Sequence, residues 1–321
     1  ALKSKDGNTM ERVQIGRKTT KGRGAGGKPP VAAESAKENS DDIAEVLKGA
    51  SLVFVAAGMG GGTGTGAAPV IAQIAKDMGI LTVGVVTKPF AFEGKRRMTQ
   101  AEQGIAELSA CVDSLIIVPN ERLKYVSDTS ITLQNAFAIA DDVLRQGVQS
   151  ISDLILLPGL VNLDFADVTS VMKDAGYAHM GMGSATGKDK ATVAADMAIS
   201  SPLLETSIDG AKGLIINITA SADVSLDDID AASTMIKDKV SDDANIIWGA
   251  VIDDKMEDAI SVTVIATGFN ADGQIAKKNL TDAVSSASAP VVAKEEPKST
   301  TKDKTDDDDD TFYDIMSIFN K

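Results

Sequence analysis

The sequence predicts an α/β fold made of two units that one long central helix joins. Three observations predict it. In the first half, short apolar runs alternate with helical patterns, which is typical of a parallel sheet covered by helices. A helical pattern then runs from roughly Ile131 to Leu156. A second, smaller series of helices and strands follows it and ends near Phe269. The 321 residues are enough for two such units with separate cores.

The elements of the first half follow one another in a regular order. A helix is predicted in Asp41–Ala50, where Ile43, Val46 and Leu47 stand at helical spacing. Continuous apolar runs predict strands that are buried on both faces, at 51–58, 80–87 and 113–119. Helical patterns follow the first two of these strands, at 67–79 and 95–112.

The second half shows the reverse order, with helices before strands. Helices are predicted at 164–176, 189–201 and 226–240, and strands at 213–221, 244–252 and 259–269. The residues from 270 to 310 are rich in Ser, Ala, Pro, Lys and Asp and predict a disordered linker. The last residues, 311–321, regain aromatic side chains and predict a peptide that binds a groove of another protein.

Composition limits the class of function. The net charge of −14 argues against nucleic acid as the main partner. The first thirty residues carry eight basic and two acidic side chains, which suits either an anion site or a solvated edge. No apolar run is long enough to span a bilayer and no signal peptide stands out, so a cytoplasmic protein without direct membrane insertion is predicted. The lone His179 and Cys111 have no partner constellation and are interpreted as structural.

The densest signal is the segment GMGGGTGTG, from Gly58 to Gly66, in which six of nine residues are glycine. A predicted strand precedes it and a predicted helix follows it. This is the geometry of anion binding, because backbone N–H groups and the helix dipole converge where glycine lets a phosphate approach. Thr63 and Thr65 add hydroxyl donors suited to phosphate oxygens or a metal-bound water. Close helix–sheet packing alone explains one or two of these glycines.

Two common phosphate motifs fit poorly. The segment 62–67 fits a dinucleotide fingerprint, but the next strand ends at Thr87-Lys88 without the acidic residue that binds the ribose. The segment 22–28 approaches a Walker loop, but Pro29 stands where a Ser or Thr would bind Mg²⁺.

The segment GGGTGTG resembles the signature of the tubulin/FtsZ superfamily. The flanking segments TKPFAFEGKRR, DSLIIVPNERL, ADDVLRQGVQSISDLI, PGLVNLDFADV and ISSPLLE resemble bacterial FtsZ and not eukaryotic tubulin. The resemblance covers nearly all of Thr20 to Phe269. It implies a tubulin-like parallel-sheet GTPase domain, a long central helix and a smaller α/β domain, with GTP/GDP and Mg²⁺ as ligands.

The resemblance also implies a set of nucleotide-binding residues. By this resemblance, the glycine loop binds the phosphates through Gly61, Gly62, Thr63, Gly64 and Thr65. The turn at Gly24, Ala25 and Gly26 would approach the γ-phosphate. Glu93 and Arg97 would reach the sugar and phosphate, although an i,i+4 surface ion pair explains their spacing equally well. The guanine site would consist of Asn120, Phe137 and Asp141; without the resemblance, Phe137 is a core residue.

Asn162, Asp164 and Asp167 lie on a loop that leads into a helix. By itself this pattern predicts N-terminal capping, which Asp164 suits well. The resemblance implies that the loop faces the next subunit of a filament, where the two aspartates position and polarise the water that attacks the γ-phosphate. Hydrolysis is then coupled to head-to-tail polymerisation.

Two departures from the family pattern stand out. The tail DIMSIF keeps Asp314, Ile315 and Phe319 of the peptide that binds membrane tethers and division regulators, but Met316 replaces the usual proline. No strand with a first phosphate loop of the type G-V-G-G-G-G-x-N occurs, so we expect a fragment of a longer chain. The predicted division is a truncated GTP-binding domain, a central helix, a C-terminal domain, a linker and a tail peptide, at 1–130, 131–157, 158–269, 270–310 and 311–321.

The functional prediction is a GTPase that polymerises into the bacterial division ring. Two alternatives stay open at this point. One is a non-catalytic interaction protein that cannot bind GTP because the first phosphate loop is missing. The other is an NAD(P)-dependent oxidoreductase.

Overall fold

The computed structural model describes residues 11–125, 132–156, 159, 161, 163–204, 207–241, 243–253 and 256–269, all of which belong to one compact unit. Asn162, the predicted linker and the tail peptide with Asp314, Ile315 and Phe319 lie outside these residues. In the described part of the chain, no helix is long and apolar enough to cross a membrane.

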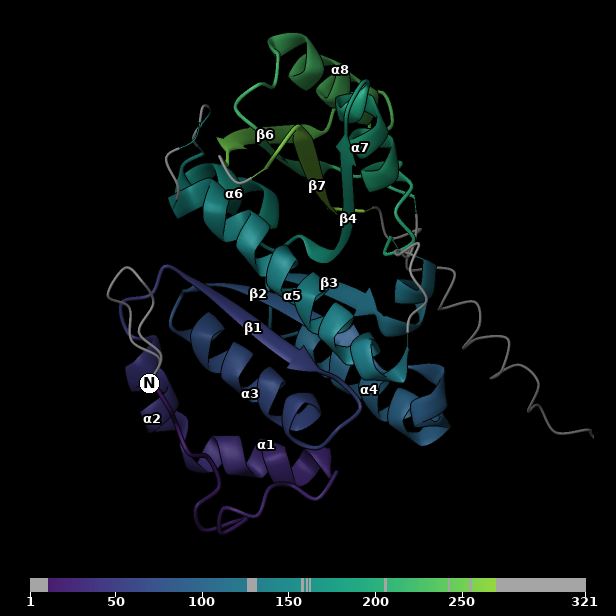
Figure 1. The fold of residues 1–321 in the computed structure, drawn as a ribbon. Helices are drawn as coiled ribbons and strands as arrows, with labels where there is room; N and C mark the ends of the chain where they lie inside the picture. Colours follow the sequence, from purple (N-terminus) through teal and green to yellow (C-terminus); the bar gives the residue numbers. More distant parts are fainter. Residues whose placement is uncertain are drawn as a thin grey trace, which may run out of the picture. The chain divides into compact units, whose positions relative to one another are not determined.

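Seven strands form one sheet in the order β1-β2-β3-β4-β7-β5-β6 (Figure 1). Their bounds are β1 Leu52–Gly58, β2 Leu81–Lys88, β3 Ser114–Pro119, β4 Gly176–Thr186, β5 Gly213–Ala220, β6 Asn245–Ile252 and β7 Ala259–Thr267. The α-helices are α1 Pro29–Glu38, α2 Ser40–Leu47, α3 Thr63–Asp77, α4 Lys95–Ser109, α5 Leu133–Leu156, α6 Phe165–Met172, α7 Lys190–Ile199 and α8 Leu226–Lys237. Two 3₁₀ helices, η1 Ala91–Glu93 and η2 Asn120–Tyr125, follow β2 and β3. The predicted α/β class is confirmed.

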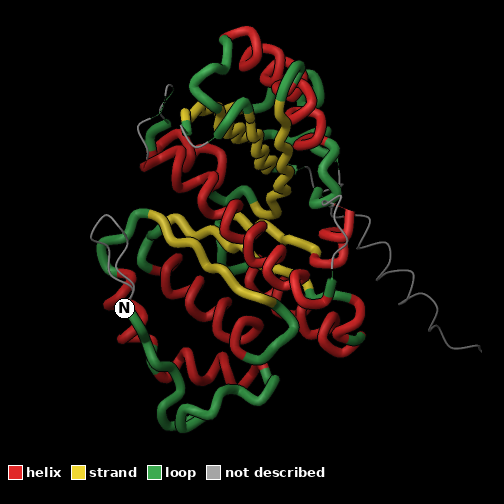
Figure 2. The backbone as a smooth tube through the Cα atoms, viewed as in Figure 1, coloured by secondary structure: helices red, strands yellow, loops and turns green. Residues whose placement is uncertain are grey.

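The three strands of the first half are parallel, as predicted, and β4 of the second half adds a fourth parallel strand. Their side chains alternate between two cores, because successive residues of a strand point to opposite faces. Val83 and Val85 of β2 pack with Ala140 and Val143 of α5 on one face. Val86 packs in the other core, which α3 and α4 cover. Figure 2 shows helices on both sides of the strands, so the long helix α5 is a buried partner of the sheet.

The second half contains an arrangement that the strand pattern did not predict. β7 lies between β4 and β5 and runs antiparallel to both, from Ala259 opposite Thr186 to Thr267 opposite Gly213. β5 and β6 are parallel. α7 packs closely on β4, where a Cβ at Gly181 would lie 2.0 Å from the carbonyl oxygen of Ala198. Glycine at this position therefore lets α7 and the sheet come together.

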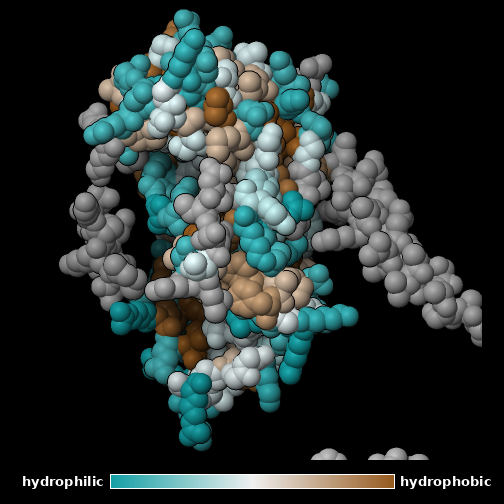
Figure 3. Space-filling model, turned by 45° about the vertical axis from the view of Figure 1, so that its right-hand side comes forward, coloured by the Kyte–Doolittle hydropathy of each residue, from teal (hydrophilic) through white to brown (hydrophobic). Residues whose placement is uncertain are grey.

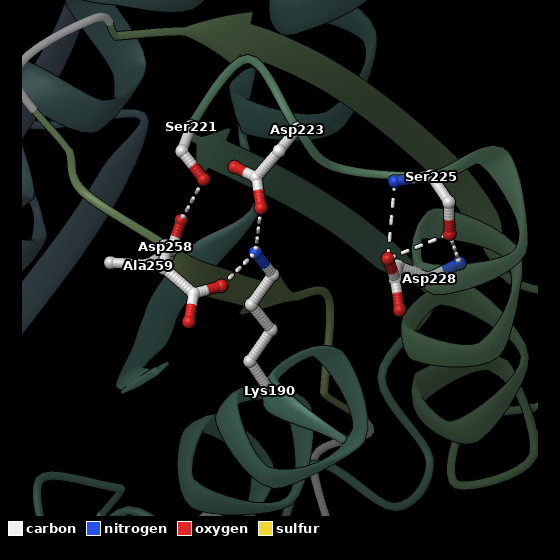
Figure 4. A network of polar contacts seen from close by, with 7 residues as sticks. All are labelled: Lys190, Ser221, Asp223, Ser225, Asp228, Asp258 and Ala259. Carbon is white, nitrogen blue, oxygen red and sulfur yellow. Dashed lines mark hydrogen bonds and ion pairs between the residues drawn. The ribbon is translucent and has the colours of Figure 1, made fainter. Parts of the chain in front are cut away.

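A buried ammonium group ties α7 to the ends of two strands (Figure 4). Lys190 Nζ lies 2.9 Å from an oxygen of Asp223 and 2.9 Å from an oxygen of Asp258. The side chain of Lys190 is only 7% exposed, whereas both carboxylates reach solvent. The hydroxyl of Ser221 and the ammonium of Lys190 lower the pKa of Asp223 from 3.8 to about 2. The two carboxylates in turn raise the pKa of Lys190.

This network predicts a defined pH dependence of stability. A carboxyl whose pKa is lowered by folding stabilises the folded state above its unfolded pKa, and this contribution is lost as the pH falls through the folded pKa. We expect Asp223→Asn to lower the free energy of unfolding by a constant amount above about pH 4, with the difference from wild type shrinking between pH 4 and about 2. Urea unfolding at several pH values measures this. Asp238→Asn at the end of α8 is the control, and a difference that is flat down to pH 2 would contradict the assignment.

Candidate functional site

Three chain segments leave the carboxyl ends of neighbouring parallel strands. Gly58, the last residue of β1, pairs with Thr87 of β2, and Lys88 of β2 pairs with Pro119 of β3. The glycine loop, η1 and η2 therefore start at the same edge of the sheet. Ligands of open α/β sheets bind outside the carboxyl ends of the strands.

The glycine loop is in contact with the two other segments predicted to bind phosphate. A Cβ at Gly60 would lie 2.6 Å from the carbonyl oxygen of Arg97, and the φ of Gly60 is +96°. A Cβ at Gly62 would lie 2.9 Å from Cβ of Ala25 and 3.0 Å from the backbone nitrogen of Lys28. Any side chain at these positions would push the segments apart. The fold thus brings together the loop, the 24–26 turn and Arg97.

One side of this arrangement is open. A Cβ at Gly61, Gly24 or Gly26 would have no atom within 4 Å. Thr63 is exposed at the first position of α3, next to Gly62. The unpaired N–H groups of a helix N-terminus carry about half a positive charge. A phosphate can therefore reach the backbone here without displacing any side chain.

Thr65 has a different environment from the one its hydroxyl suggested. It is 2% exposed, and its Oγ1 accepts a hydrogen bond of 2.9 Å from the N–H of Gly60. Its methyl group packs against Gly104 of α4, where a Cβ would lie 2.4 Å away. Thr65 thus holds the loop closed on its buried side, and Gly61 and Thr63 lie on its open side.

A second helix N-terminus lies beside the first. α1 begins at Pro29, a residue that suits the first position of a helix because it has no N–H to satisfy. The turn before it is built on left-handed glycines, with φ of +78° at Gly24, +60° at Gly26 and +70° at Gly27. The exposed Lys28 adds positive charge. Both helices direct their positive ends toward the same open space.

The predicted base site lies beyond η1. Asn120 is 4% exposed, and its Oδ1 has no hydrogen-bond partner among the described residues. A buried acceptor without a donor is costly and suits a ligand that supplies one. Phe137 is 46% exposed although it is aromatic, so it is not the plain core residue that its helical spacing suggested. Asp141 is exposed one turn further along α5.

Glu93 and Arg97 form the i,i+4 ion pair that their spacing predicts, with Arg97 Nε 3.1 Å from a carboxylate oxygen of Glu93. The other oxygen of Glu93 accepts a hydrogen bond of 2.9 Å from the N–H of Phe90. Glu93 therefore fixes η1, and the side chain of Arg97 is half exposed beside the glycine loop.

Asp164 and Asp167 cap α6 reciprocally. The N–H of Asp167 donates to Asp164 Oδ1 at 2.8 Å, and the N–H of Asp164 donates to Asp167 Oδ2 at 3.2 Å. The predicted capping is confirmed, and both carboxylates are exposed. Their other oxygen atoms remain accessible to solvent or to a second molecule.

The aspartate pair lies far from the glycine loop in one copy of the chain. The loop follows β1 at one end of the sheet, whereas α6 packs on β5 and β6 at the other end (Figure 1). Six spacings between neighbouring strands correspond to about 29 Å along a flat sheet. The last residue of α6, Met172, accepts a hydrogen bond from Ser114, at the amino end of β3. The fold thus links the glycine loop, the 24–26 turn, Arg97, Glu93 and Phe137 through a series of contacts, and these two aspartates are not part of that series.

A strand–glycine loop–helix unit at the carboxyl edge, with predicted base-binding residues on a long central helix, is typical of a nucleotide-binding α/β protein of the tubulin class. The comparisons agree with this class. Residues 2–128 match the GTPase domain of the Tubulin/FtsZ family, and residues 176–270 match the C-terminal domain of the FtsZ family. The chain belongs to the FtsZ family.

Solved structures support the same assignment. An empty FtsZ dimer from M. jannaschii is 41% identical, with a TM-score of 0.77, over 80% of this chain and 75% of that one. A tryptophan-to-tyrosine mutant of M. jannaschii FtsZ has the same identity and TM-score, over 80% of this chain and 77% of that one. CetZ1 from Haloferax volcanii, a GDP-bound monomer, is 20% identical with a TM-score of 0.69, over 87% of this chain and 84% of that one, and shows the fold alone. The family is one of GTPases, so guanine-nucleotide binding and self-association are its general properties.

Sequence reasoning missed two residues beside the predicted base site. Phe92 is exposed on η1, and Glu121 accepts a hydrogen bond of 2.9 Å from the N–H of Ala91, which ties η2 to η1. The Phe-Ala-Phe pattern that starts at Phe90 could have pointed to Phe92. A short turn leaves one of two such phenylalanines exposed, and an exposed phenylalanine requires an explanation.

Proposed function

We propose that this chain binds GTP at the glycine loop and hydrolyses it between two copies in a head-to-tail filament. One observation carries the proposal: the phosphate cradle and the aspartate pair lie at opposite ends of the same sheet. A loop on one copy and an aspartate pair on the next can meet, because a head-to-tail contact joins two different surfaces.

Each residue has a defined task in this proposal. The N–H groups at Gly61, Gly62, Thr63 and Gly64 bind phosphate oxygens, with Thr65 holding the loop closed. The turn at Gly24, Ala25 and Gly26 binds the γ-phosphate, and Arg97 neutralises negative charge beside the loop. These groups position the nucleotide and stabilise the charge that develops during transfer, which is most of what phosphoryl transfer needs.

The base site uses complementary groups. Asp141 accepts hydrogen bonds from the donor edge of guanine, and Asn120 Oδ1 accepts one further donor. Phe137 stacks on the base. Glu93 keeps the adjoining turn in place by accepting the N–H of Phe90. It is also paired with Arg97 beside the glycine loop, and from this position it contacts the ribose.

The aspartates of the next copy act on water. Asp164 and Asp167, with Asn162 beside them, orient the attacking water and polarise it toward the γ-phosphate. The described residues contain no group of three or more His, Cys, Asp or Glu that could hold a metal ion. We propose that Mg²⁺ enters with the phosphates, since Mg²⁺ is commonly bound by substrate phosphates and one or two carboxylates.

Turnover measured against protein concentration tests the proposal. A shared site predicts that GTP hydrolysed per molecule rises with concentration in step with light scattering, because only assembled copies have complete sites. Turnover per molecule that stays flat while filaments form would contradict the shared site. A titration that detects no GTP or GDP binding would instead favour the non-catalytic interaction protein.

The wider role follows from the family. We propose that the filament acts in the cytoplasm at the division site, as part of the division ring, and that the tail at Asp314, Ile315 and Phe319 binds division regulators or membrane tethers. We also propose the division into a GTP-binding domain, central helix, C-terminal domain, linker and tail at 1–130, 131–157, 158–269, 270–310 and 311–321.

A further inference from the structure

Three phenylalanine rings meet where η1 approaches α5. Phe90 is buried, whereas Phe92 is 58% exposed and Phe137 is 46% exposed. The rings of Phe90 and Phe92 are stacked, with centroids 5.1 Å apart and planes 13° apart. Phe137 meets both rings edge to face, at centroid distances of 5.5 and 6.4 Å. Figure 3 shows that apolar residues reach the surface in patches on the face it draws. The three phenylalanine rings differ from scattered exposed apolar residues because they make defined stacked and edge-to-face contacts with one another.

The exposed ring of Phe92 is held in place by its surroundings. The turn that carries it is closed by the hydrogen bond from the N–H of Phe90 to Glu93. A second hydrogen bond, from the N–H of Ala91 to Glu121, fixes the turn to η2. The buried ring of Phe90 supports Phe92 from one face. Phe92 is therefore a fixed apolar surface, and its exposure to water costs free energy that a ligand can recover.

The two exposed rings form a corner. The planes of Phe92 and Phe137 are 87° apart, so a flat group that stacks on Phe137 and reaches Phe92 is edge to face with Phe92. Aromatic groups favour this arrangement at centroid distances of about 4.5 to 7 Å. A purine is wider than a phenyl ring, so a purine stacked on Phe137 extends past the rim of that ring to a second wall.

Two polar residues lie close in sequence to the residues that hold these rings. Asn120, with its unpaired Oδ1, directly precedes Glu121, which binds η1. Asp141 lies one helical turn from Phe137. Two exposed rings and two acceptors for base donors on neighbouring segments have the composition expected of a site that recognises a flat polar ring.

We propose that Phe92 is a base-contacting residue of the nucleotide site, whose ring forms the second wall against the purine of a guanosine di- or triphosphate. This assignment rests on the proposed function and adds a residue to it. An edge-to-face aromatic contact predicts that removal of the ring lowers GDP affinity about tenfold.

The experiment uses the full chain and GDP as the probe. Phe92→Ala is expected to bind GDP about tenfold more weakly, with an unchanged midpoint of thermal unfolding in the absence of nucleotide. Phe92→Tyr is expected to restore affinity, because it keeps the ring. Leu226→Ala, which removes an even more exposed apolar side chain from α8, is the matched control and should bind GDP as wild type does.

A spectroscopic variant gives a second readout that does not depend on stability. The emission of Phe92→Trp, measured above that of Trp248, should change on GDP binding, because the indole touches the base. GDP binding without any change in this emission would overturn the assignment, as would Phe92→Ala that binds GDP like wild type. Normal GDP affinity with impaired assembly would assign Phe92 to the contact between copies instead. If wild type itself bound no GDP, the proposed function would fail and this assignment with it.

Discussion

Replacing Asp164 and Asp167 together by asparagine is expected to lower GTP turnover by about a hundredfold or more, with GDP affinity unchanged. The variant removes the negative charge that orients and polarises water. It keeps the fold, because asparagine caps a helix as well as aspartate does. Each asparagine keeps one side-chain oxygen, which can accept the backbone N–H that Asp164 Oδ1 or Asp167 Oδ2 accepts in the capping box. Steady-state turnover and equilibrium binding, measured on the same preparation, check the two halves of this expectation.

The chain offers a matched control for this variant. α8 begins with a similar capping box, in which Ser225 and Asp228 bond each other's backbone N–H groups. Asp228→Asn changes a capping carboxylate in the same way and is expected to leave turnover unchanged. An equal loss of turnover in both variants would mean that capping, and not water activation, explains the effect.

Mixing two inactive variants tests where the aspartates act. The double aspartate variant keeps an intact glycine loop, whereas Gly61→Ala keeps intact aspartates. If both can join a filament, about a quarter of randomly formed contacts in an equal mixture combine the two intact halves. We expect turnover to reappear in the mixture. No recovery in mixed filaments would contradict a site shared between copies.

Gly66→Ala is expected to lower the free energy of unfolding by about 3 kcal/mol or to prevent folding. A Cβ at this position would lie 2.0 Å from the carbonyl oxygen of Pro29, a backbone atom that cannot move without the whole of α1. α1 and α3 would have to separate, and the two helix N-termini would lose their common orientation. Urea unfolding followed by circular dichroism measures the loss.

Gly61→Ala is the control for Gly66→Ala, because it is expected to weaken GTP binding and to leave folding stability intact. A Cβ at Gly61 has no atom within 4 Å, and the φ of Gly61 is not in the left-handed region. Its stability should therefore be unchanged or slightly higher, since alanine lowers the entropy of the unfolded chain. GTP affinity should fall, because the new methyl group occupies the open side of the loop. Equal destabilisation of both variants would contradict the packing described for Gly66.

The strands of the first half could be predicted because burial on both faces leaves an unmistakable apolar run, as in 80–87. The antiparallel β7 could not, since its apolar pattern is the same for either strand direction and only the pairing of Ala259 with Thr186 decides it. α1 was also missed. Its residues are small and weakly patterned, and the helix begins at the proline pair Pro29 and Pro30, since proline suits a first turn.

The candidate site was predictable where one residue type has one physical use. Dense glycine after a buried strand indicates close approach, and the contacts at Gly60 and Gly62 agree. Residue type alone leaves two uses open for Thr65, since the same hydroxyl can bind a ligand or close a loop, and its oxygen accepts the N–H of Gly60. Residue type did not identify Phe92, because the sequence pattern cannot show that a turn keeps an aromatic side chain exposed to solvent.

The position of β7 affects how the protein is made. The last of the described strands to leave the ribosome is the one that sits between β4 and β5. Until Ala259–Thr267 has been synthesised, both of these earlier strands expose unpaired N–H and C=O groups. At about 5 to 20 residues per second, roughly four to sixteen seconds pass between the completion of β4 and that of β7. A nascent chain is therefore most open to wrong pairing during this interval, and translation pauses before Ala259 would prolong it.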